Sequence, residues 1–250
     1  MLLSDAKSIY INNKEAKEIW YGGSRIWTPV PKVPSKCLTD TYTWSQISQI
    51  SANGTANEYF NLGDTAKVTS ASGIEYTLIL AVIYIDKDVN NNPVLTFVHR
   101  YADPCSWYTG SSGFKAYTDS NCIVGSAAKN LANALDTAMG GNILKTKNVG
   151  YYASAGTTTV STTQLKGWVL CIGEINNTGS GIAKGIYYPY LYDNAVEIFG
   201  TVTESYDYWS RETGSTYVVY WMGMDNNNKM VRVSTTARNE SKNIVMAFCV

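Results

Sequence analysis

The sequence predicts an α+β fold that is rich in antiparallel β-strands and contains a few helices. The composition favours strands and turns, because the 250 residues include 19 Tyr, 7 Trp and 20 Gly. Short runs of alternating apolar residues recur between Gly-rich and Asn-rich segments, which is the pattern of strands joined by turns. A chain of this length suffices for one large domain with a small appendage.

The first residues predict a small β-hairpin unit followed by a spacer. Residues 8–27 hold two short apolar-alternating runs around polar turns, including a Gly-Gly pair. Pro29, Pro31 and Pro34 come next, and their fixed φ angles and missing amide donors predict a semi-rigid extended segment. We therefore divide the chain into a hairpin unit (1–28), a proline-rich spacer (29–36) and a large domain (37–250).

The first half of the large domain predicts a capped helix and then a hairpin. Thr43 is expected to cap a helix with Trp44, Ile47 and Ile50 at helical spacing, and residues 56–60 add a further turn. Predicted strands follow at residues 66–69, 74–85 and 94–101. The turn-forming residues 86–93 join the last two strands as a β-hairpin.

The main helix is predicted over residues 126–139. Its apolar residues share one helical stripe, and Gly140 and Gly141 supply the stop. The stripe consists of Ala127, Leu131, Ala134, Leu135 and Ala138. Further short strands are predicted at residues 167–174, 196–199, 217–224, 230–234 and 243–250.

Composition and charge exclude several classes of partner. The 20 acidic residues balance the 20 basic ones, and no basic run forms a patch, so nucleic acid is not an expected partner. The longest apolar run, residues 76–85, is about half of the ~20 residues that cross a bilayer, so no membrane insertion is expected. Residues 1–11 lack the features of a signal peptide, and we expect none.

The cysteines and the histidine predict structural roles. Five cysteines are scattered without a C-x-x-C pair, which favours small core residues from a reducing compartment over disulfides or zinc. His99 is the only histidine, on a predicted strand face shared with Leu95, Phe97 and Tyr101. No G-x-S-x-G turn offers a nucleophile, and nothing pairs Cys105 or Cys122 with a base. We therefore expect no catalytic residue and no cofactor.

Two acidic patterns raise the alternatives of calcium binding and of glycoside hydrolysis. Asp86, Asp88, Asn90 and Asn92 have the alternate spacing of a calcium loop, but Asn91 and Phe97 replace its Gly and Glu. A solvated turn without metal is the better interpretation. Paired carboxylates can also hydrolyse a glycosidic bond, and the sequence leaves that alternative open. The candidates are Glu197, Glu204, Asp207 and Glu212.

Clustered aromatic residues point to ligand binding. Flat rings with polar edges stack on sugars or fill protein hot spots, and adjacent Asp, Asn and Arg can bind hydroxyl groups. The alternative is that many of these rings lie in the core, with Arg211 paired to Glu212 or to a backbone carbonyl. A further cluster, residues 187–190, contains three Tyr. The candidate ligand-binding residues are Trp107, Tyr108, Tyr208, Trp209, Arg211, Glu212, Tyr217, Tyr220, Trp221, Asp225 and Asn227.

Two stretches resemble known phage proteins. Ile19-Trp-Tyr-Gly-Gly-Ser-Arg-Ile-Trp27 resembles the short N-terminal module of tail proteins from phages of Gram-positive bacteria. The remainder resembles an uncharacterised domain family of phage tail proteins and Firmicutes surface proteins. The matching pieces are the segment from Trp44 to Asp64, Asp207-Tyr-Trp-Ser-Arg-Glu212 and Ile244-Val-Met-Ala-Phe-Cys-Val250. The aromatic-Arg segment, the Gly-Met-Asp-Asn-Asn-Asn turn at residues 223–228 and the terminal strand are also similar in order to C-type-lectin-like domains, including phage tropism determinants.

These resemblances imply a phage virion tail component without catalysis. The hairpin unit would attach to other tail or baseplate proteins, and the large domain would bind a host-surface glycan or protein. Analogy with tail fibres suggests a homotrimer, assembled into the virion in the host cytoplasm. The alternatives are a wall-glycan hydrolase with paired carboxylates, a purely architectural baseplate subunit, or a bacterial surface domain.

Overall fold

The computed structural model describes most of the chain, in two compact units, Met1–Pro34 and Ser35–Val250. The described residues are 10–11, 14–15, 19–21, 24–27, 36–107, 116–152, 160–176, 186–199, 207–213, 218–227, 229–237 and 241–250.

The first unit contains two antiparallel strand pairs. In one pair β1 (Tyr10–Ile11) runs against β2 (Lys14–Glu15), and in the other β3 (Ile19–Tyr21) runs against β4 (Ser24–Trp27). The hairpin predicted over residues 8–27 is thus two short pairs. Of the predicted spacer, residues 29–35 lie outside the described residues.

The second unit is a mixed α+β structure built on an eight-stranded, mostly antiparallel sheet, as the sequence predicted. Seven strands follow the order β13-β12-β11-β14-β7-β6-β5, and β10 also pairs with β14. The β11–β14 pair is parallel. The strands are β5 (Thr65–Thr69), β6 (Glu75–Lys87), β7 (Pro93–Ser106), β10 (Gly167–Val169), β11 (Tyr208–Thr213), β12 (Val218–Met224), β13 (Met230–Ala237) and β14 (Ser241–Cys249). A separate two-stranded sheet pairs β8 (Lys147–Tyr152) with β9 (Val160–Leu165).

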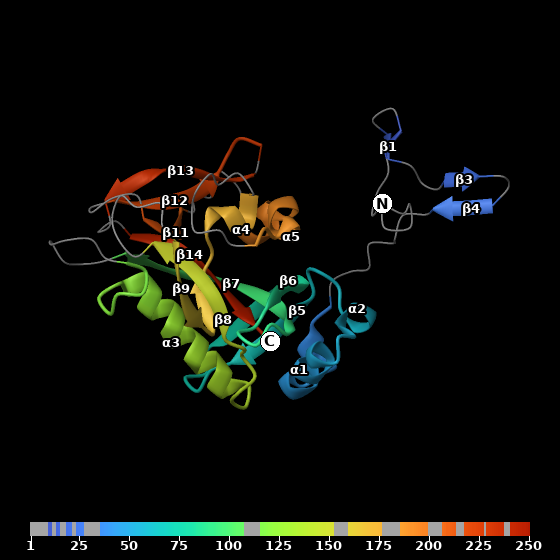
Figure 1. Ribbon diagram of the computed structural model, residues 1–250, viewed down its shortest axis with the longest axis horizontal. Helices are drawn as coiled ribbons and strands as arrows, with labels where there is room; N and C mark the ends of the chain where they lie inside the picture. The colour runs from blue at the N-terminus through green and yellow to red at the C-terminus, as the bar shows by residue number, and fades with distance from the viewer. Residues whose placement is uncertain are drawn as a thin grey trace. The chain divides into compact units, whose positions relative to one another are not determined.

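Helices pack on both faces of the sheet (Figure 1). α1 and α3 share one core with β6, β7 and β14, whereas α4, α5 and α6 share a second core on the other face. The helices are the 3-10 helix η2 (Leu38–Asp40), α1 (Trp44–Ala52), α2 (Ala56–Tyr59), α3 (Ile123–Ala138), α4 (Ile172–Asn176), α5 (Pro189–Asp193) and α6 (Ala195–Phe199). Among the described residues, none of the helices has both the length and the apolarity needed to cross a bilayer.

From Ile244 onward strand β14 is buried on both faces, which explains the unbroken apolar run from Ile244 to Cys249. Successive side chains of a strand point to opposite faces, so a strand between two cores has no solvent-facing position. β14 pairs with β7 along one side and with β10 and β11 along the other. Its residues Ile244, Met246 and Phe248, with Val250 directly after it, belong to the core with α1 and α3. Val245, Ala247 and Cys249 belong to the core with α4, α5 and α6.

The two longer helices begin at residues that satisfy free backbone amides. Thr43 and Gln46 form a reciprocal capping box at the start of α1, which confirms the predicted cap. α3 begins three residues earlier than predicted, because the Cys122 thiol accepts the amide of Gly125 and opens the helix there. Position 125 requires glycine, because a Cβ there would lie 2.1 Å from the Tyr117 carbonyl oxygen.

One predicted strand is helical, and another is a strand only at its start. Residues 167–174 form the short strand β10 and then enter α4, and the predicted strand at 196–199 is the helix α6. In α6 the buried residues Ala195, Ile198 and Phe199 have helical spacing, so burial of one helix face overrides the β-propensity of Val and Ile. Strands β8, β9 and β11 were not predicted. The hairpin of β6 and β7 and the strands β12, β13 and β14 confirm the predictions for those segments.

Candidate functional site

Three of the aromatic residues predicted to bind a ligand are core residues instead. The side chains of Trp107, Tyr208 and Trp209 are fully buried. Trp209 donates from its indole nitrogen to the Cys105 carbonyl oxygen at 2.6 Å, and Tyr208 donates its hydroxyl to the Phe199 carbonyl oxygen at 2.7 Å. Because both polar tips are satisfied inside the protein, these rings fill the core rather than meet a ligand.

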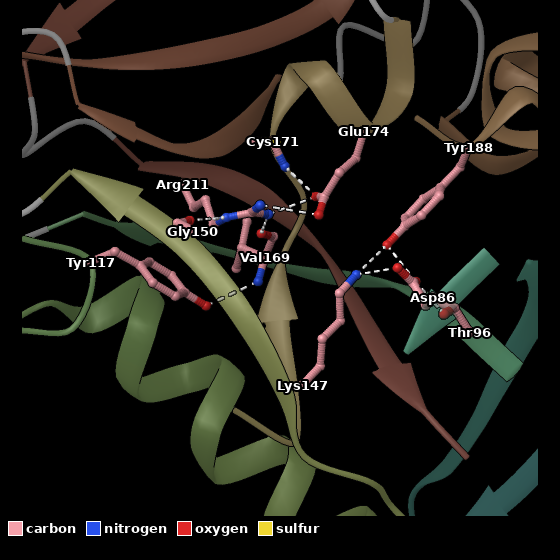
Figure 2. Close-up of polar contacts among 10 residues, drawn as sticks. All are labelled: Asp86, Thr96, Tyr117, Lys147, Gly150, Val169, Cys171, Glu174, Tyr188 and Arg211. Carbon is pink, nitrogen blue, oxygen red and sulfur yellow. Dashed lines mark hydrogen bonds and ion pairs between the residues drawn. The ribbon is translucent and has the colours of Figure 1, made fainter. Parts of the chain in front are cut away.

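Arg211, another predicted ligand contact, is the centre of a buried network. Its guanidinium binds both carboxylate oxygens of Glu174, at 2.6 and 3.0 Å, and donates to the carbonyl oxygens of Gly150 and Val169, each at 2.8 Å (Figure 2). The predicted pairing with a backbone carbonyl is confirmed, whereas the acidic partner is Glu174 and not Glu212. The network ties β11 to β8, β10 and α4.

The electrostatics of this network fit a structural role. Burial alone would raise the pKa of the Glu174 carboxyl, but the charge and hydrogen bonds of Arg211, with the Cys171 amide at 2.9 Å, hold that pKa below its ordinary value. A carboxylate kept ionised and fully hydrogen-bonded is a poor general acid or base at neutral pH. Glu174 and Arg211 therefore stabilise the fold.

A second buried polar cluster lies between β6, β7, β8 and the residue before α5. Lys147 binds the Asp86 carboxylate and the Tyr188 hydroxyl, the latter at 3.0 Å. Asp86 also accepts the Thr96 hydroxyl at 2.5 Å and the Tyr188 hydroxyl at 2.6 Å (Figure 2). Burial, followed by the charges of Glu174 and Asp86, raises the pKa of Tyr188 well above its ordinary value, so the phenol keeps its proton. The ammonium of Lys147 also lies 4.6 Å from the centre of the Trp168 ring.

This cluster separates the residues of the calcium-like pattern. Asp86 points into the interior, whereas Asp88 closes its own turn by accepting the amides of Asn90 at 2.8 Å and Asn92 at 2.9 Å. The arrangement is that of a self-capped turn, and Asp86 is already paired with an ammonium. Within the described residues no group of three or more His, Cys, Asp and Glu side chains could hold a metal ion.

The carboxylates considered for glycoside hydrolysis are not gathered in the described structure. Glu197 is exposed on α6, and Asp207 forms an ion pair with Lys242 at 2.9 Å. Glu204 lies outside the described residues, and for Glu212 the structure describes the backbone in β11 but not the side chain. The hydrolase alternative therefore gains no support from these positions.

His99 and the cysteines occupy structural positions. The Nδ1 atom of His99 lies 2.9 Å from the Thr77 carbonyl oxygen, and its ring packs edge-on against Tyr76. All five cysteines lie in the described residues as free thiols, three of them buried. Burial raises the pKa of Cys105 to about 11 and that of Cys122 to about 12, so neither is a reactive thiolate at neutral pH.

The remaining described candidates, Asp225 and Asn227, lie on a surface turn beside α5. Asp225 accepts the amides of Asn227 and Lys229 at 2.9 Å, which fixes the turn between β12 and β13. Lys229 reaches over to α5, where its ammonium lies 4.2 Å from the centre of the Tyr192 ring and donates to the Tyr192 carbonyl oxygen at 3.2 Å. The turn and the helix therefore form one surface.

Tyr187 completes this surface. Its ring lies 6.4 Å from that of Tyr192 in an edge-to-face arrangement, and both rings are partly exposed. Burial, then the charge of Asp193, raises the pKa of the Tyr187 phenol, so it remains a hydrogen-bond donor at neutral pH. We name this the tyrosine–lysine surface; it consists of Tyr187, Tyr192, Asp225, Asn227 and Lys229. It combines aromatic rings, an ammonium and an exposed amide on a fixed turn, which suits binding of a polar ligand.

Sequence reasoning found part of this surface. Asp225, Asn227 and the tyrosine cluster at 187–190 were singled out, but Tyr192 and Lys229 were not. Their contact joins segments 37 residues apart, and no local sequence pattern predicts it. Of the other candidates, Tyr108 and Tyr217 lie outside the described residues, and the structure describes only the backbone of Tyr220 and Trp221 in β12.

Comparison of the chain with protein-family models, with curated proteins and with solved structures found no match.

Proposed function

We propose that this chain is a component of a phage virion tail that binds a glycan or protein on the host surface without catalysis. The observation that carries the proposal is the tyrosine–lysine surface. Tyr187 and Tyr192 present two partly exposed rings beside the ammonium of Lys229. Tyrosines are enriched among the residues that dominate the binding energy of recognition surfaces, and their side chains, with two χ angles, lose little entropy on binding.

The interior of the large unit favours binding over catalysis. Glu174 and Asp86 each have a cationic partner and several hydrogen-bond donors, so their charges contribute to stability. We infer that the large unit has a C-type-lectin-like architecture. A mostly antiparallel sheet with a few helices is compatible with that architecture, which presents its ligand sites at the surface.

The first unit suits an attachment role. Met1–Pro34 is compact by itself and contains two short strand pairs, one of which carries the Ile19–Trp27 motif that resembles tail-protein modules. We propose that it binds other tail or baseplate proteins. Assembly as a homotrimer follows from analogy with tail fibres.

Binding of the fluorescent full-length chain to intact Gram-positive cells and to their wall glycans tests the proposal. We expect saturable binding that Tyr187→Ala combined with Tyr192→Ala weakens about tenfold or more, because truncated hot-spot aromatics commonly cost 2 kcal/mol or more. Tyr59→Ala is the matched control, since Tyr59 is an exposed tyrosine on α2, outside this surface.

Two other outcomes would replace the proposal. Release of reducing sugar in the same tubes, abolished by substitution of one carboxylate, would establish the wall-glycan hydrolase. Stable assembly with tail proteins, with neither binding nor release, would establish an architectural subunit. Equal binding by the double variant and the Tyr59→Ala control would remove the tyrosine–lysine surface from the receptor contact.

A further inference from the structure

Two hollows flank the N-terminal half of α3 and meet there. The first has a volume of about 500 Å³ and lies between α3 and the end of β9, with Lys129, Asn133 and Gln164 in its lining. The second has a volume of about 640 Å³ and lies on the flank of α3 that faces Tyr76 of β6. Ser120 and Ser126 line both hollows, and we name the two neighbouring hollows together the α3 groove. Each volume is in the range of small-molecule sites.

The groove has an apolar floor and an amide-rich rim. Ala127, Leu131 and Ala134 line the second hollow beside the Tyr76 ring, and Leu165 lines the first. The exposed amides of Asn130, Asn133 and Gln164 lie along the rim, and their side chains make no hydrogen bond to other described residues. Each amide group offers both donors and an acceptor to a ligand.

The groove is lined by charges of both signs. Lys166 is neutralised by Asp136 at 2.5 Å, and the Asp119 carboxylate accepts two hydrogen bonds from Asn121. Lys129 has no acidic partner among the described residues, and the Asp119 carboxylate lies in the same lining. A lining that holds a carboxylate beside its ammonium groups is a poor site for a polyanion.

The groove is held rigidly. The backbone at Gly167 packs so closely on α3 that a Cβ there would lie 2.7 Å from the Cβ of Ala132. Asp136 accepts the amides of Ile143 and Leu144, each at 2.8 Å, and its ion pair with Lys166 fastens the end of β9 to the helix. A preformed site avoids the entropic cost of ordering on binding.

From these features we propose that the α3 groove binds a neutral oligosaccharide. Two neighbouring hollows offer separate subsites to a chain-like ligand, free amides match sugar hydroxyl and acetamido groups, and the apolar floor with the Tyr76 ring matches the C–H face of a sugar ring. The proposal does not rest on the tyrosine–lysine surface, because the two sites share no residue.

Nuclear magnetic resonance titration of the ¹⁵N-labelled full chain locates the binding. The probes are maltotriose, cellotriose and triacetylchitotriose at millimolar concentration, with poly(glycerol phosphate) as an anionic comparison. We expect at least one trisaccharide to shift the backbone amide signals of α3 and β9. Asn133→Ala combined with Gln164→Ala is expected to raise its Kd about tenfold, as expected for loss of two neutral hydrogen bonds. Asn130→Ala is expected to raise it by a smaller factor.

Asn57→Ala is the matched control, because Asn57 is an exposed amide on α2 outside the groove. An unchanged Kd in the groove variants overturns the proposal, as does the absence of shifts with all three trisaccharides. Stronger shifts with poly(glycerol phosphate) around Lys129 overturn the neutral ligand class. Shifts confined to Tyr187, Tyr192 and Lys229 overturn the groove and support the tyrosine–lysine surface, so the two sites fail separately.

Discussion

Arg211 binds Glu174 through two hydrogen bonds inside the protein, from Nη1 to Oε2 at 2.6 Å and from Nη2 to Oε1 at 3.0 Å. Both side chains are 1% exposed, so neither charge can be hydrated if the other is removed. A bidentate guanidinium–carboxylate pair also fixes the relative orientation of its two backbone segments, here β11 and α4.

Removal of one partner of this pair is expected to destabilise the large unit. Arg211→Met should lower the free energy of unfolding by about 3 to 5 kcal/mol, because it leaves the Glu174 charge buried and unpaired. Urea denaturation followed by tryptophan fluorescence measures the loss. The double variant Arg211→Met/Glu174→Leu should lose less than the sum of the two single variants, and additive losses would contradict direct coupling.

Variants of the Asp86 cluster are expected to lose different amounts of unfolding free energy. Tyr188→Phe removes one donor to Asp86 and should cost about 1 to 2 kcal/mol of unfolding free energy, whereas Lys147→Met leaves a buried carboxylate without its cation and should cost about 3 to 5 kcal/mol. Thermal unfolding of both variants tests the order. Lys242→Met is a comparison, because its partner Asp207 is 39% exposed and can be hydrated. A larger loss for Tyr188→Phe than for Lys147→Met would contradict this account.

The depressed pKa values predict loss of stability in acid. Burial would raise the pKa of Asp136, but Lys166 and the amides of Leu144 and Ile143 outweigh this effect and hold the pKa below its ordinary value. Arg211 lowers the pKa of the buried Glu174 below 4.5 in the same way. A lowered folded pKa contributes stability that is fully present above the unfolded pKa and is lost as the pH falls through the folded value. The midpoint of thermal unfolding should therefore hold down to about pH 5 and fall below about pH 4.5.

The variant Asp136→Asn should flatten part of this acid dependence, because its side chain no longer titrates. Glu75→Gln is the matched control, since Glu75 pairs with Lys67 at the surface, where both side chains are about half exposed. Identical pH profiles for Asp136→Asn and the unmodified chain would remove Asp136 from the explanation.

Thiol labelling tests the burial of the cysteines. Burial raises the pKa of Cys105 from 9.0 to about 11, which lowers its thiolate fraction about a hundredfold at pH 8. Cys122, Cys171 and Cys249 are buried as well. Reaction of the native protein with Ellman's reagent should give one fast equivalent from Cys37, and Cys37→Ser should abolish that phase. Rapid reaction of more than one thiol would contradict the structure.

Features set by local chemistry were predictable from the sequence. The helix cap at Thr43 and the hairpin turn at residues 86–93 depend on a few consecutive side chains, and the double-sided burial of β14 follows from an unbroken apolar run. Pairings between distant segments were not predictable. Lys147 and Asp86 are 61 residues apart, and Arg211 and Glu174 are 37 apart.

The candidate binding residues illustrate the same division. Trp209 and Asn227 were equally plausible contacts in the sequence, since both lie in aromatic or polar clusters. The structure separates them, because Trp209 fills the core beside Trp107 whereas Asn227 is exposed on the β12–β13 turn. Only the packing of the sheet decides which aromatic residues remain at the surface.

The central place of β14 also sets the order in which the fold can be completed during synthesis. β5, β6 and β7 are synthesised before the other strands of this sheet and can form a meander. β10, β11, β12 and β13 are synthesised later and lie on the other side of β14, which has not been made at that stage. Until residues 241–250 have been made, the inner edge of β7 has no partner and both apolar cores lack their shared wall. The nascent chain therefore carries an open sheet edge from the completion of β7 until β14 has been made, and insertion of one strand closes both cores together.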